Sequence, residues 1–473
     1  MDLERRELLI GAGVAGGLGI AGIGVAVLDE KESGATTETP ESVDVPHADE
    51  FGTVVDAVAV GADPDGGEPI NGVLEEYAGD DTLLSFPDGT YRLQPITLAD
   101  YSRFGIAGAR GAKPTFVAEA GNCVGGGSSY LHVKNVDGFL MDSVAFDFTG
   151  DSTGGIVRIT ADGDATITNV RASGQCDDQV ALFRLDVVEE SATAVAQRLR
   201  LDNHSSDSWL TGIYVGKQHA GDVVFRNCTI QGFTDNGLYA SAPGLPDGEG
   251  GIVHVEGGTY RNNNVANVRL GSAGSVARGV TSISDSPPPS DGEVTANARG
   301  FRLRSGHGQL IEDCTVRITD DSRFTHGGIV FHETNGGATV RETRIDIDRD
   351  ETPAIRLFPR STDNPETPTV ENVEITGGAA GGRAVLLADR DETVFRNCTI
   401  SQSGENRNGI HFRDSSDCRI IDSRIDVTNY PLVLQNSTVR IENTTLVTPD
   451  GTEEIKELAA TESDFPPGGN DDR

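Results

Sequence analysis

The feature that most restricts the fold of this chain is a short pattern that recurs along most of its length. The seven residues VFRNCTI occur twice, at Val224–Ile230 and at Val394–Ile400. Both are instances of one code, in which apolar residues lie two positions before and three positions after a turn residue. Twelve copies follow one another about 27 residues apart. Their turn residues are Asp142, Asn169, Arg198, Asn227, Gly257, Arg278, Asp313, Glu342, Asn372, Asn397, Asp422 and Asn443.

The apolar positions of this code predict stacked coils of short strands. All twelve residues two positions before the turn are apolar, and Thr281 is the one exception among the twelve residues three positions after it. Alternation with a period of two places one set of side chains inside and the other set in solvent. Since parallel coils stack about 4.8 Å apart, twelve coils predict a rod roughly 55 Å long. A pattern this regular argues against a globular α/β domain.

A second strand in each coil has the pattern small, apolar, variable, apolar. Its eight copies are Gly212–Val215, Gly237–Ala240, Asn267–Leu270, Gly300–Leu303, Gly328–Phe331, Ala354–Leu357, Ala384–Leu387 and Gly409–Phe412. Ahead of the coils, Pro69–Tyr77 has the spacing of an amphipathic helix, and the turn sequence FPDGTY follows it. This beginning resembles the N-terminal cap of pectate-lyase-like right-handed parallel β-helices. The resemblance implies an all-β fold, a single-stranded right-handed parallel β-helix of about 12 coils with an N-terminal capping helix.

The two ends of the chain differ from the repeated body. Arg5 and Arg6 precede an uncharged, glycine-rich stretch, Leu8–Leu28, which resembles a twin-arginine export signal. A plain membrane anchor is the alternative, because about 20 apolar residues can span a bilayer. We predict an export signal or anchor at 1–28, an acidic linker at 29–50, the β-helix at 51–448 and a disordered acidic tail at 449–473. Either interpretation predicts an extracellular or cell-surface protein, which contacts the membrane only through an uncleaved N-terminal segment.

The charge balance restricts the partners of the protein. The chain carries 38 basic and 74 acidic residues, a net charge of −36, which argues against nucleic acid binding. Lysine is scarce, so that arginine supplies nearly all of the positive charge. An acidic surface poor in lysine resembles that of proteins from extremely halophilic archaea, where carboxylates keep a protein hydrated in high salt. An ordinary acidic secreted protein is the alternative.

The variable position of the second strand gathers cationic and aromatic side chains and should face outward. Along the coils it holds Tyr214, Tyr239, Arg269, Arg302, Val330, Arg356, Leu386 and His411. Arginine pairs with carboxylates in a bidentate manner, and tyrosine offers a flat face to a sugar ring. We therefore expect Tyr214, Tyr239, Arg269, His411 and Arg413 to bind an acidic polysaccharide or cell-surface glycan. The alternative is that these side chains only balance acidic neighbours on a sheet face.

If the outward residues of the second strand are catalytic, the resemblance implies that they carry out β-elimination. Enzymes of this kind use Ca²⁺ or arginine to neutralise the carboxylate of a uronic acid, while a base removes the proton at C5. Here Arg302, Arg304 and Arg356 would hold the carboxylate. His332 would accept the proton, because the pKa of histidine suits neutral pH.

Two further candidate sites follow from individual residues. Glu333 or Asp389 could supply oxygen ligands to Ca²⁺, but no cluster of three acids stands out at adjacent coil positions, and no metal ligands are assigned. The stretches Cys176–Leu182 (CDDQVAL) and Ser305–Gly308 (SGHG) resemble motifs of polygalacturonases. Their Asp pair and His307 would lie about four coils apart, roughly 19 Å, and the Asn-Thr-Asp motif of that family is absent. We therefore interpret the Asp pair as an acidic turn.

Three cysteines share one column of the code, namely Cys228, Cys314 and Cys398. Consecutive members are three coils apart, about 14 Å, which is too far for a disulfide because the Cα atoms of a disulfide lie within about 7 Å. We predict that they are small buried residues.

Five Asn-x-Ser/Thr sequons divide into two groups. Asn227, Asn397 and Asn443 fall on the turn column, where stacked asparagines can form hydrogen bonds from coil to coil. Asn203 and Asn436 lie outside that column and are candidates for glycosylation.

These patterns predict an exported β-helix protein that binds an acidic polysaccharide and could cleave it by β-elimination or hydrolysis. A non-catalytic cell-surface carbohydrate-binding or adhesive scaffold is the alternative, and an epimerase is a third hypothesis. If the protein is an enzyme, it is a polysaccharide lyase or a glycoside hydrolase. The distinction between an enzyme and a scaffold depends on whether the candidate catalytic side chains lie close together. Catalysis requires an acid, a base and a charge stabiliser within a few ångströms, whereas adhesion requires only a spread surface.

Overall fold

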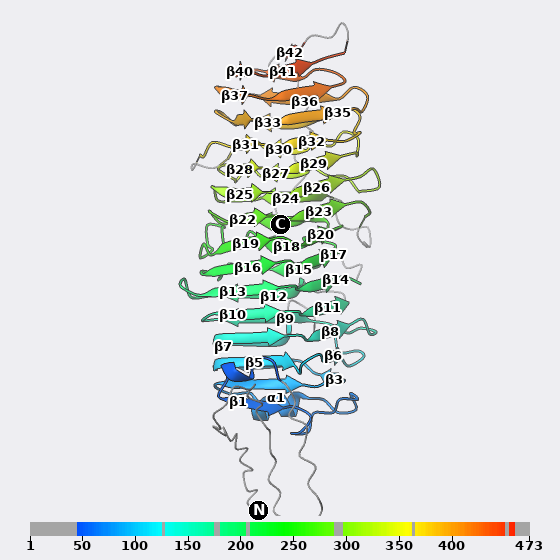
Figure 1. The fold of residues 1–473 in the computed structure, drawn as a ribbon, viewed down its shortest axis with the longest axis vertical. Coiled ribbons are helices and arrows are strands. Elements are labelled where there is room, and N and C mark those ends of the chain that lie inside the picture. The colour runs from blue at the N-terminus through cyan, green and yellow to red at the C-terminus, as the bar shows by residue number, and fades with distance from the viewer. Residues whose placement is uncertain are drawn as a thin grey trace, which may run out of the picture.

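The computed structural model describes residues 45–124, 128–174, 180–204, 209–287, 297–361, 365–449 and 454–458. They form a right-handed β-solenoid of about twelve turns, built mostly of short strands with one short α-helix (Figure 1). The turns are stacked in chain order along the long axis of the rod, from β1 at one end to β42 at the other (Figure 1). The predicted fold class is therefore confirmed.

Three parallel sheets run along the rod, and from β2 onward every coil contributes one strand to each. Sheet A contains β1 Thr53–Asp56, β2 Thr82–Phe86, β5 Ser102–Gly108, β7 Ser129–Asp142, β10 Ala165–Thr168, β13 Thr193–Gln197, β16 Asp222–Arg226, β19 Ile252–Glu256, β22 Val276–Arg278, β25 Gln309–Glu312, β28 Ala338–Arg341, β31 Thr369–Glu371, β34 Val394–Arg396, β37 Cys418–Ile421 and β40 Val439–Glu442. Sheet B contains β3 Thr90–Leu93, β6 Thr115–Ala118, β8 Ala145–Phe148, β11 Arg171–Gly174, β14 Arg200–Asp202, β17 Thr229–Gln231, β20 Thr259–Arg261, β23 Thr281–Ser284, β26 Thr315–Ile318, β29 Arg344–Ile347, β32 Glu374–Thr376, β35 Thr399–Gln402, β38 Arg424–Val427 and β41 Thr445–Val447. Sheet C contains β4 Ile96–Ala99, the first part of β7, β9 Ile156–Ala161, β12 Ala181–Val187, β15 Thr211–Tyr214, β18 Leu238–Ala240, β21 Val265–Leu270, β24 Ala298–Leu303, β27 Ile329–Phe331, β30 Ile355–Leu357, β33 Arg383–Ala388, β36 Asn408–Arg413, β39 Leu432–Gln435 and β42 Ile455–Leu458.

The corner between sheets A and B has a constant length. From β7 to β41, two residues separate each strand of sheet A from the following strand of sheet B. The first of these two residues has a positive φ on every coil: Ser143, Asn169, Arg198, Asn227, Gly257, Gly279, Asp313, Glu342, Asn372, Asn397, Asp422 and Asn443. One left-handed residue is enough to turn the chain, and asparagine, aspartate and glycine tolerate that conformation best. Ten of the twelve predicted turn residues occupy this position.

Two predicted turn residues are wrong by one position. The turn residue is Ser143 and not Asp142, and it is Gly279 and not Arg278. The second correction also explains the exception at Thr281, because the inward residue of that coil is Ser282, which is 1% exposed.

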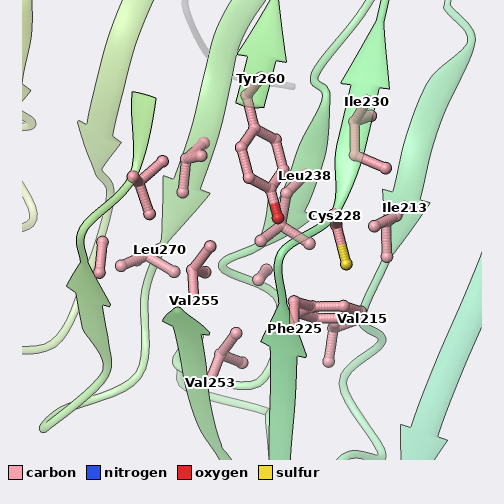
Figure 2. Close-up of a cluster of buried hydrophobic side chains, with 14 of the residues drawn as sticks. Ile213, Val215, Phe225, Cys228, Ile230, Leu238, Val253, Val255, Tyr260 and Leu270 are labelled. Atoms are coloured by element: carbon pink, nitrogen blue, oxygen red, sulfur yellow. The ribbon is translucent and has the colours of Figure 1, made fainter. Parts of the chain in front are cut away.

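One continuous hydrophobic core fills the rod. Side chains from all three sheets converge in it, and Figure 2 shows Phe225 and Val255 of sheet A close to Tyr260 of sheet B and Leu238 of sheet C. The predicted cysteine column is confirmed as buried and free of disulfides: Cys228, Cys314 and Cys398. Burial raises the pKa of the Cys228 thiol to about 12, so that this thiol is inert at neutral pH.

The two ends of the rod are closed differently. The predicted cap is α1 Asn71–Tyr77, which places Leu74 against the core of the first coils, and a single 3-10 turn, η1 Ala48–Glu50, precedes β1. At the other end β42 pairs with β39 and extends sheet C beyond residue 448, where the predicted body ends.

The predicted signal at 1–28 lies outside the described residues. Within the part of the chain that the structure describes, no helix has the length and hydrophobicity needed to cross a membrane.

Candidate functional site

The outward column of sheet C has the register that the sequence predicts. Strand pairing aligns one residue from each successive coil: Thr97, His132, Arg158, Arg184, Tyr214, Tyr239, Arg269, Arg302, Val330, Arg356, Leu386, His411, Val433 and Lys456. The flanking positions, such as Phe301 and Ile329, belong to the core. We call the column from His132 to His411 the sheet C column.

The middle of this column is buried, which the sequence pattern does not predict. Arg269 and Arg302 are each 1% exposed, and His411 is 2% exposed. Burial, reinforced by the neighbouring charge of Arg302, lowers the pKa of Arg269 to about 9. An outward position therefore does not make a side chain accessible here.

Part of the cover over the column comes from the turn before β27. His326 reaches the next coil, where its Nδ1 lies 3.1 Å from Nη1 of Arg356. The same imidazole makes edge contacts with the rings of Phe324 and Phe358, and the guanidinium of Arg356 lies 4.2 Å from the centroid of the Phe358 ring. Arg356 is thus enclosed by aromatic side chains and is 6% exposed.

The four predicted catalytic residues lie on three consecutive coils. Arg302 belongs to β24, His332 directly follows β27, and Arg356 belongs to β30. Nδ1 of His332 lies 2.8 Å from Oγ1 of Thr334 and 3.2 Å from the backbone nitrogen of the same residue. His332 is 6% exposed, and its role as the base stays a prediction. Arg304 is more accessible than Arg302 and Arg356.

The accessible part of the column consists of Arg184, Tyr214 and Tyr239, which are partly exposed, and Tyr239 packs against the buried Arg269. The rings of Tyr214 and Tyr239 lie 5.2 Å apart on adjacent coils. The guanidinium of Arg184 lies 5.2 Å from the centroid of the Tyr214 ring, and that of Arg269 lies 3.9 Å from the centroid of the Tyr239 ring. Arg269 also donates to the hydroxyl of Tyr239 at 3.1 Å. Both tyrosines are half-buried, so the stack offers partly exposed aromatic faces beside fixed cations.

Three further residues of the column lie toward its N-terminal end, and the second-strand pattern described above does not include them. They are His132, Arg158 and Arg184, on β7, β9 and β12. A signal for them exists, because the residues FRL at Phe183–Leu185 reappear at Phe301–Leu303 in the second-strand pattern.

A carboxyl group next to the stack also escaped the sequence analysis. Asp235, in the turn before β18, accepts hydrogen bonds from the hydroxyl of Thr211 at 2.8 Å and from Nδ2 of Asn236 at 3.0 Å. Burial raises the pKa of Asp235, although the charge of Arg269 opposes the shift. A carboxyl group with a raised pKa can act as a proton donor.

The remaining candidates lie apart from one another. Among the described residues, no group of three or more His, Cys, Asp or Glu side chains is arranged to hold a metal ion. Glu333 and Asp389 are exposed and belong to coils two steps apart. His307 lies 3.3 Å from the carboxylate of Glu366, and the Asp pair of the CDDQVAL stretch lies outside the described residues. Arg413 is half-buried, with its guanidinium 3.2 Å from Asp414.

The asparagine amides take part in contacts between coils. On the turn column, Nδ2 of Asn397 donates to Asn372 and that of Asn443 donates to Asp422, each at 2.7 Å. The glycosylation candidates do the same outside it: Nδ2 of Asn203 donates to the carbonyl of Gly232 at 2.8 Å, and that of Asn436 donates to Asp414 at 2.9 Å. A glycan on Asn203 or Asn436 would have to replace these bonds, because Nδ2 is the atom that carries it.

Comparisons with known proteins concern the fold. Residues 327–450 match the family model described as "Right handed beta helix region", and no curated protein sequence matches the chain. The chain is similar to PfbA, a surface adhesin of Streptococcus pneumoniae, with 10% identity, a TM-score of 0.35 and coverage of 86% of this chain and 93% of that chain. It is also similar to the family 28 exopolygalacturonase of Yersinia enterocolitica (11% identity, TM-score 0.29, coverage 86% and 78%). A third similar structure is the A-module of the mannuronan C-5 epimerase AlgE4 from Azotobacter vinelandii (13% identity, TM-score 0.32, coverage 86% and 91%). Similarities at this level assign no activity to the chain.

Proposed function

We propose that this protein binds an acidic polysaccharide along the accessible part of the sheet C column. The observation that carries the proposal is the stack of Arg184, Tyr214, Tyr239 and Arg269 on four consecutive coils. The partly exposed guanidinium of Arg184 complements carboxylates, and the tyrosine rings offer apolar faces to the C–H side of a sugar ring. Arg269 is buried and holds the Tyr239 ring in place.

The charge of the whole protein supports an anionic ligand at this place. With a net charge of −36, the surface repels polyanions in general. A polyanion is therefore attracted only where cations are concentrated, and the sheet C column concentrates them on adjacent coils. The coils repeat about every 4.8 Å, so a chain of sugars that lies along the rod meets the same kind of contact several times.

Direct binding measurements test this proposal. The protein is titrated in molar KCl with polygalacturonate, alginate and hyaluronate, and with neutral dextran as the control polymer. We expect binding to at least one uronate polymer and none to dextran. The variants Tyr214→Ala and Tyr239→Ala should weaken this binding, whereas Tyr101→Ala, a half-buried tyrosine that packs on Phe104 of sheet A, should not. Equal binding of dextran, or no effect of the tyrosine variants, would contradict the proposal.

Cleavage of the bound polymer is the second candidate function, and Asp235 favours it. Burial raises the pKa of this carboxyl group, the direction that a proton donor requires, and the charge of Arg269 lies beside it. The expected result is that unsaturated or reducing ends appear with the native protein, while Asp235→Asn abolishes them and leaves polymer binding within about twofold. Binding without any new ends from the native protein would instead favour a non-catalytic adhesive scaffold.

We further propose that the protein is exported by the twin-arginine route and works in molar salt. Cys123 is disulfide-bonded, and disulfides persist in oxidising compartments outside the cytoplasm. Replacing Arg5 and Arg6 by lysine should retain the protein in the cytoplasm of a host with this export route, as measured by cell fractionation. Unchanged export of the double variant would rule out the proposed route.

A further inference from the structure

The N-terminal end of the sheet C column carries an excess of positive charge. On three consecutive coils, the outer face of sheet C presents His132 and Lys134 on β7, Arg158 on β9, and Arg184 with Asp186 on β12. We call these five residues the cationic cluster. At neutral pH Lys134, Arg158 and Arg184 supply three positive charges against the one carboxylate, in a protein whose net charge is −36. His132 is neutral there, because its pKa is lowered to about 4.

The one carboxylate of the cluster, that of Asp186, forms an ion pair with Arg184. Asp186 is fully buried and accepts from Nε of Arg184 at 2.6 Å, from the backbone N–H of Gly216 at 2.6 Å and from Nε2 of Gln218 at 3.2 Å. These three bonds fix the carboxylate, and the carboxylate in turn fixes the guanidinium of Arg184 over the ring of Tyr214. Asp186 therefore orients Arg184 and offsets its charge.

Arg158 has no comparable partner. It is half-buried one coil away from Arg184, and its side chain makes no hydrogen bond or ion pair with any residue in the described ranges. Its Nε is buried and unsatisfied. Burial and the adjacent charge of Arg184 lower the pKa of Arg158, and the carboxylate of Asp186 opposes this shift only in part. A buried donor left unsatisfied costs free energy that a ligand with acceptor oxygens can recover.

We propose that Arg158 and Arg184 form an anion subsite that takes a carboxylate or sulfate group of a polysaccharide. The subsite rests on the proposed function, because it lies at the end of the same column and next to Tyr214. A carboxylate or a sulfate group can accept two parallel hydrogen bonds from a guanidinium, and Lys134 adds positive potential around it. The subsite selects the charged group of the glycan, and the tyrosine stack contacts the adjoining sugar rings.

Small anions test the subsite without a polymer. The thermal unfolding midpoint is measured in KCl of fixed ionic strength, with part of the chloride replaced by galacturonate or by inorganic sulfate, and with galactose as the neutral control. We expect at least one anion to raise the midpoint of the native protein more than that of Arg158→Ala and Arg158→Gln. The control Arg171→Ala removes an exposed arginine of sheet B and should respond like the native protein. Sulfate stabilises proteins in general by exclusion from the surface, so the difference between variants is the measured quantity.

The two anions distinguish the two chemical sources. A specific effect of galacturonate alone assigns a uronate, an effect of sulfate alone assigns a sulfate ester, and an effect of both supports the shared chemistry. If the native protein and both Arg158 variants respond equally to both anions, the subsite proposal is overturned. With a uronate polymer, Arg158→Ala should bind about tenfold more weakly than the native protein. If no polymer binds but the anion effect depends on Arg158, the proposed function fails and the subsite remains.

Discussion

Buried arginines at the corners of the rod hold neighbouring coils together. Arg407 is fully buried, and it donates to the side-chain carbonyl of Gln402 at 2.8 Å and to the backbone carbonyls of Gly381 at 2.8 Å and Thr352 at 2.6 Å. These acceptors belong to three consecutive coils. Burial lowers the pKa of Arg407 to about 10, so that it stays charged at neutral pH and its bonds are charge-assisted.

Replacing Arg407 by lysine should therefore destabilise the fold. An ammonium group cannot reach three acceptors in this geometry, and at least one buried carbonyl loses its partner. We expect the free energy of unfolding to fall by about 3 kcal/mol, as measured by urea denaturation in constant KCl. The control Arg419→Lys changes an exposed arginine and should stay within about 0.5 kcal/mol of the native protein. Equal stabilities of the two variants would show that the three bonds contribute little.

His132 should make stability depend on pH. Burial, together with the charges of Arg158, Lys134 and Arg184, lowers the pKa of His132 from 6.5 to about 4. Between these two values the unfolded chain binds a proton that the folded protein does not, so stability falls as the pH is lowered from 6.5 to about 4. His132→Gln removes this contribution. Urea denaturation at several pH values should show a shallower loss for the variant, and identical pH profiles would contradict the assignment.

At the residue scale, the sequence predicts which side of a strand a residue occupies but not whether it is accessible. Period-two alternation placed Arg302 and Arg356 on the outer face correctly. Their burial depends on neighbours from other coils, such as His326, whose turn folds over Arg356. No local pattern contains that information. The same limit applies to Asp235, because its raised pKa arises from surroundings that the chain assembles only on folding.

At the scale of the elements, sheet A carries an alternating ladder of charges on its outer face. Seven consecutive coils contribute, in register, Arg226, Glu256, Arg278, Glu312, Arg341, Glu371 and Arg396. Glu312 forms ion pairs with the arginines on both sides, Arg278 and Arg341, and these pairs lower its pKa. A slip of one coil would place like charges against each other, so the ladder favours one register.

Reversing one charge in this ladder should cost stability in a salt-dependent way. Glu312→Arg places three arginines next to one another, and we expect a loss of about 2 kcal/mol at low salt. Screening should reduce the loss in molar KCl. The comparison is with Glu405→Arg, which changes an exposed acid in a turn, and denaturation is followed by circular dichroism. A loss that is independent of salt would point to packing and not to charge.

The register of the strands is predicted correctly at ten of the twelve coils. The prediction is wrong at two coils, where two neighbouring residues before the turn are both apolar. Leu140 and Met141 are both apolar before the turn of one coil, and Val276 and Ala277 are both apolar before the turn of the other. Met141 and Ala277 are the residues in the core. Hydrophobicity alone cannot decide between two such registers, because each buries one apolar side chain.

At the scale of the whole molecule, the net charge of −36 predicts that stability requires salt. Like charges repel one another more in the compact state than in the expanded chain, and salt screens this repulsion. We expect the urea midpoint to rise steadily with KCl concentration up to the molar range. If screening is the cause, the chloride salt of another monovalent cation should raise the urea midpoint by a similar amount. A midpoint that does not change with salt would contradict the proposed adaptation to high salt.

The constant corner between sheets A and B restricts where this chain can change in length. Its two residues leave no room for an insertion, because one extra residue would break the stacking of left-handed turns on the coils above and below. From β8 to β42, the connections on either side of sheet C vary from three to thirteen residues. Insertions and deletions in related sequences should therefore gather on the two rims of sheet C. Evolution can reshape the borders of the proposed binding face, coil by coil, while the opposite corner keeps every column aligned.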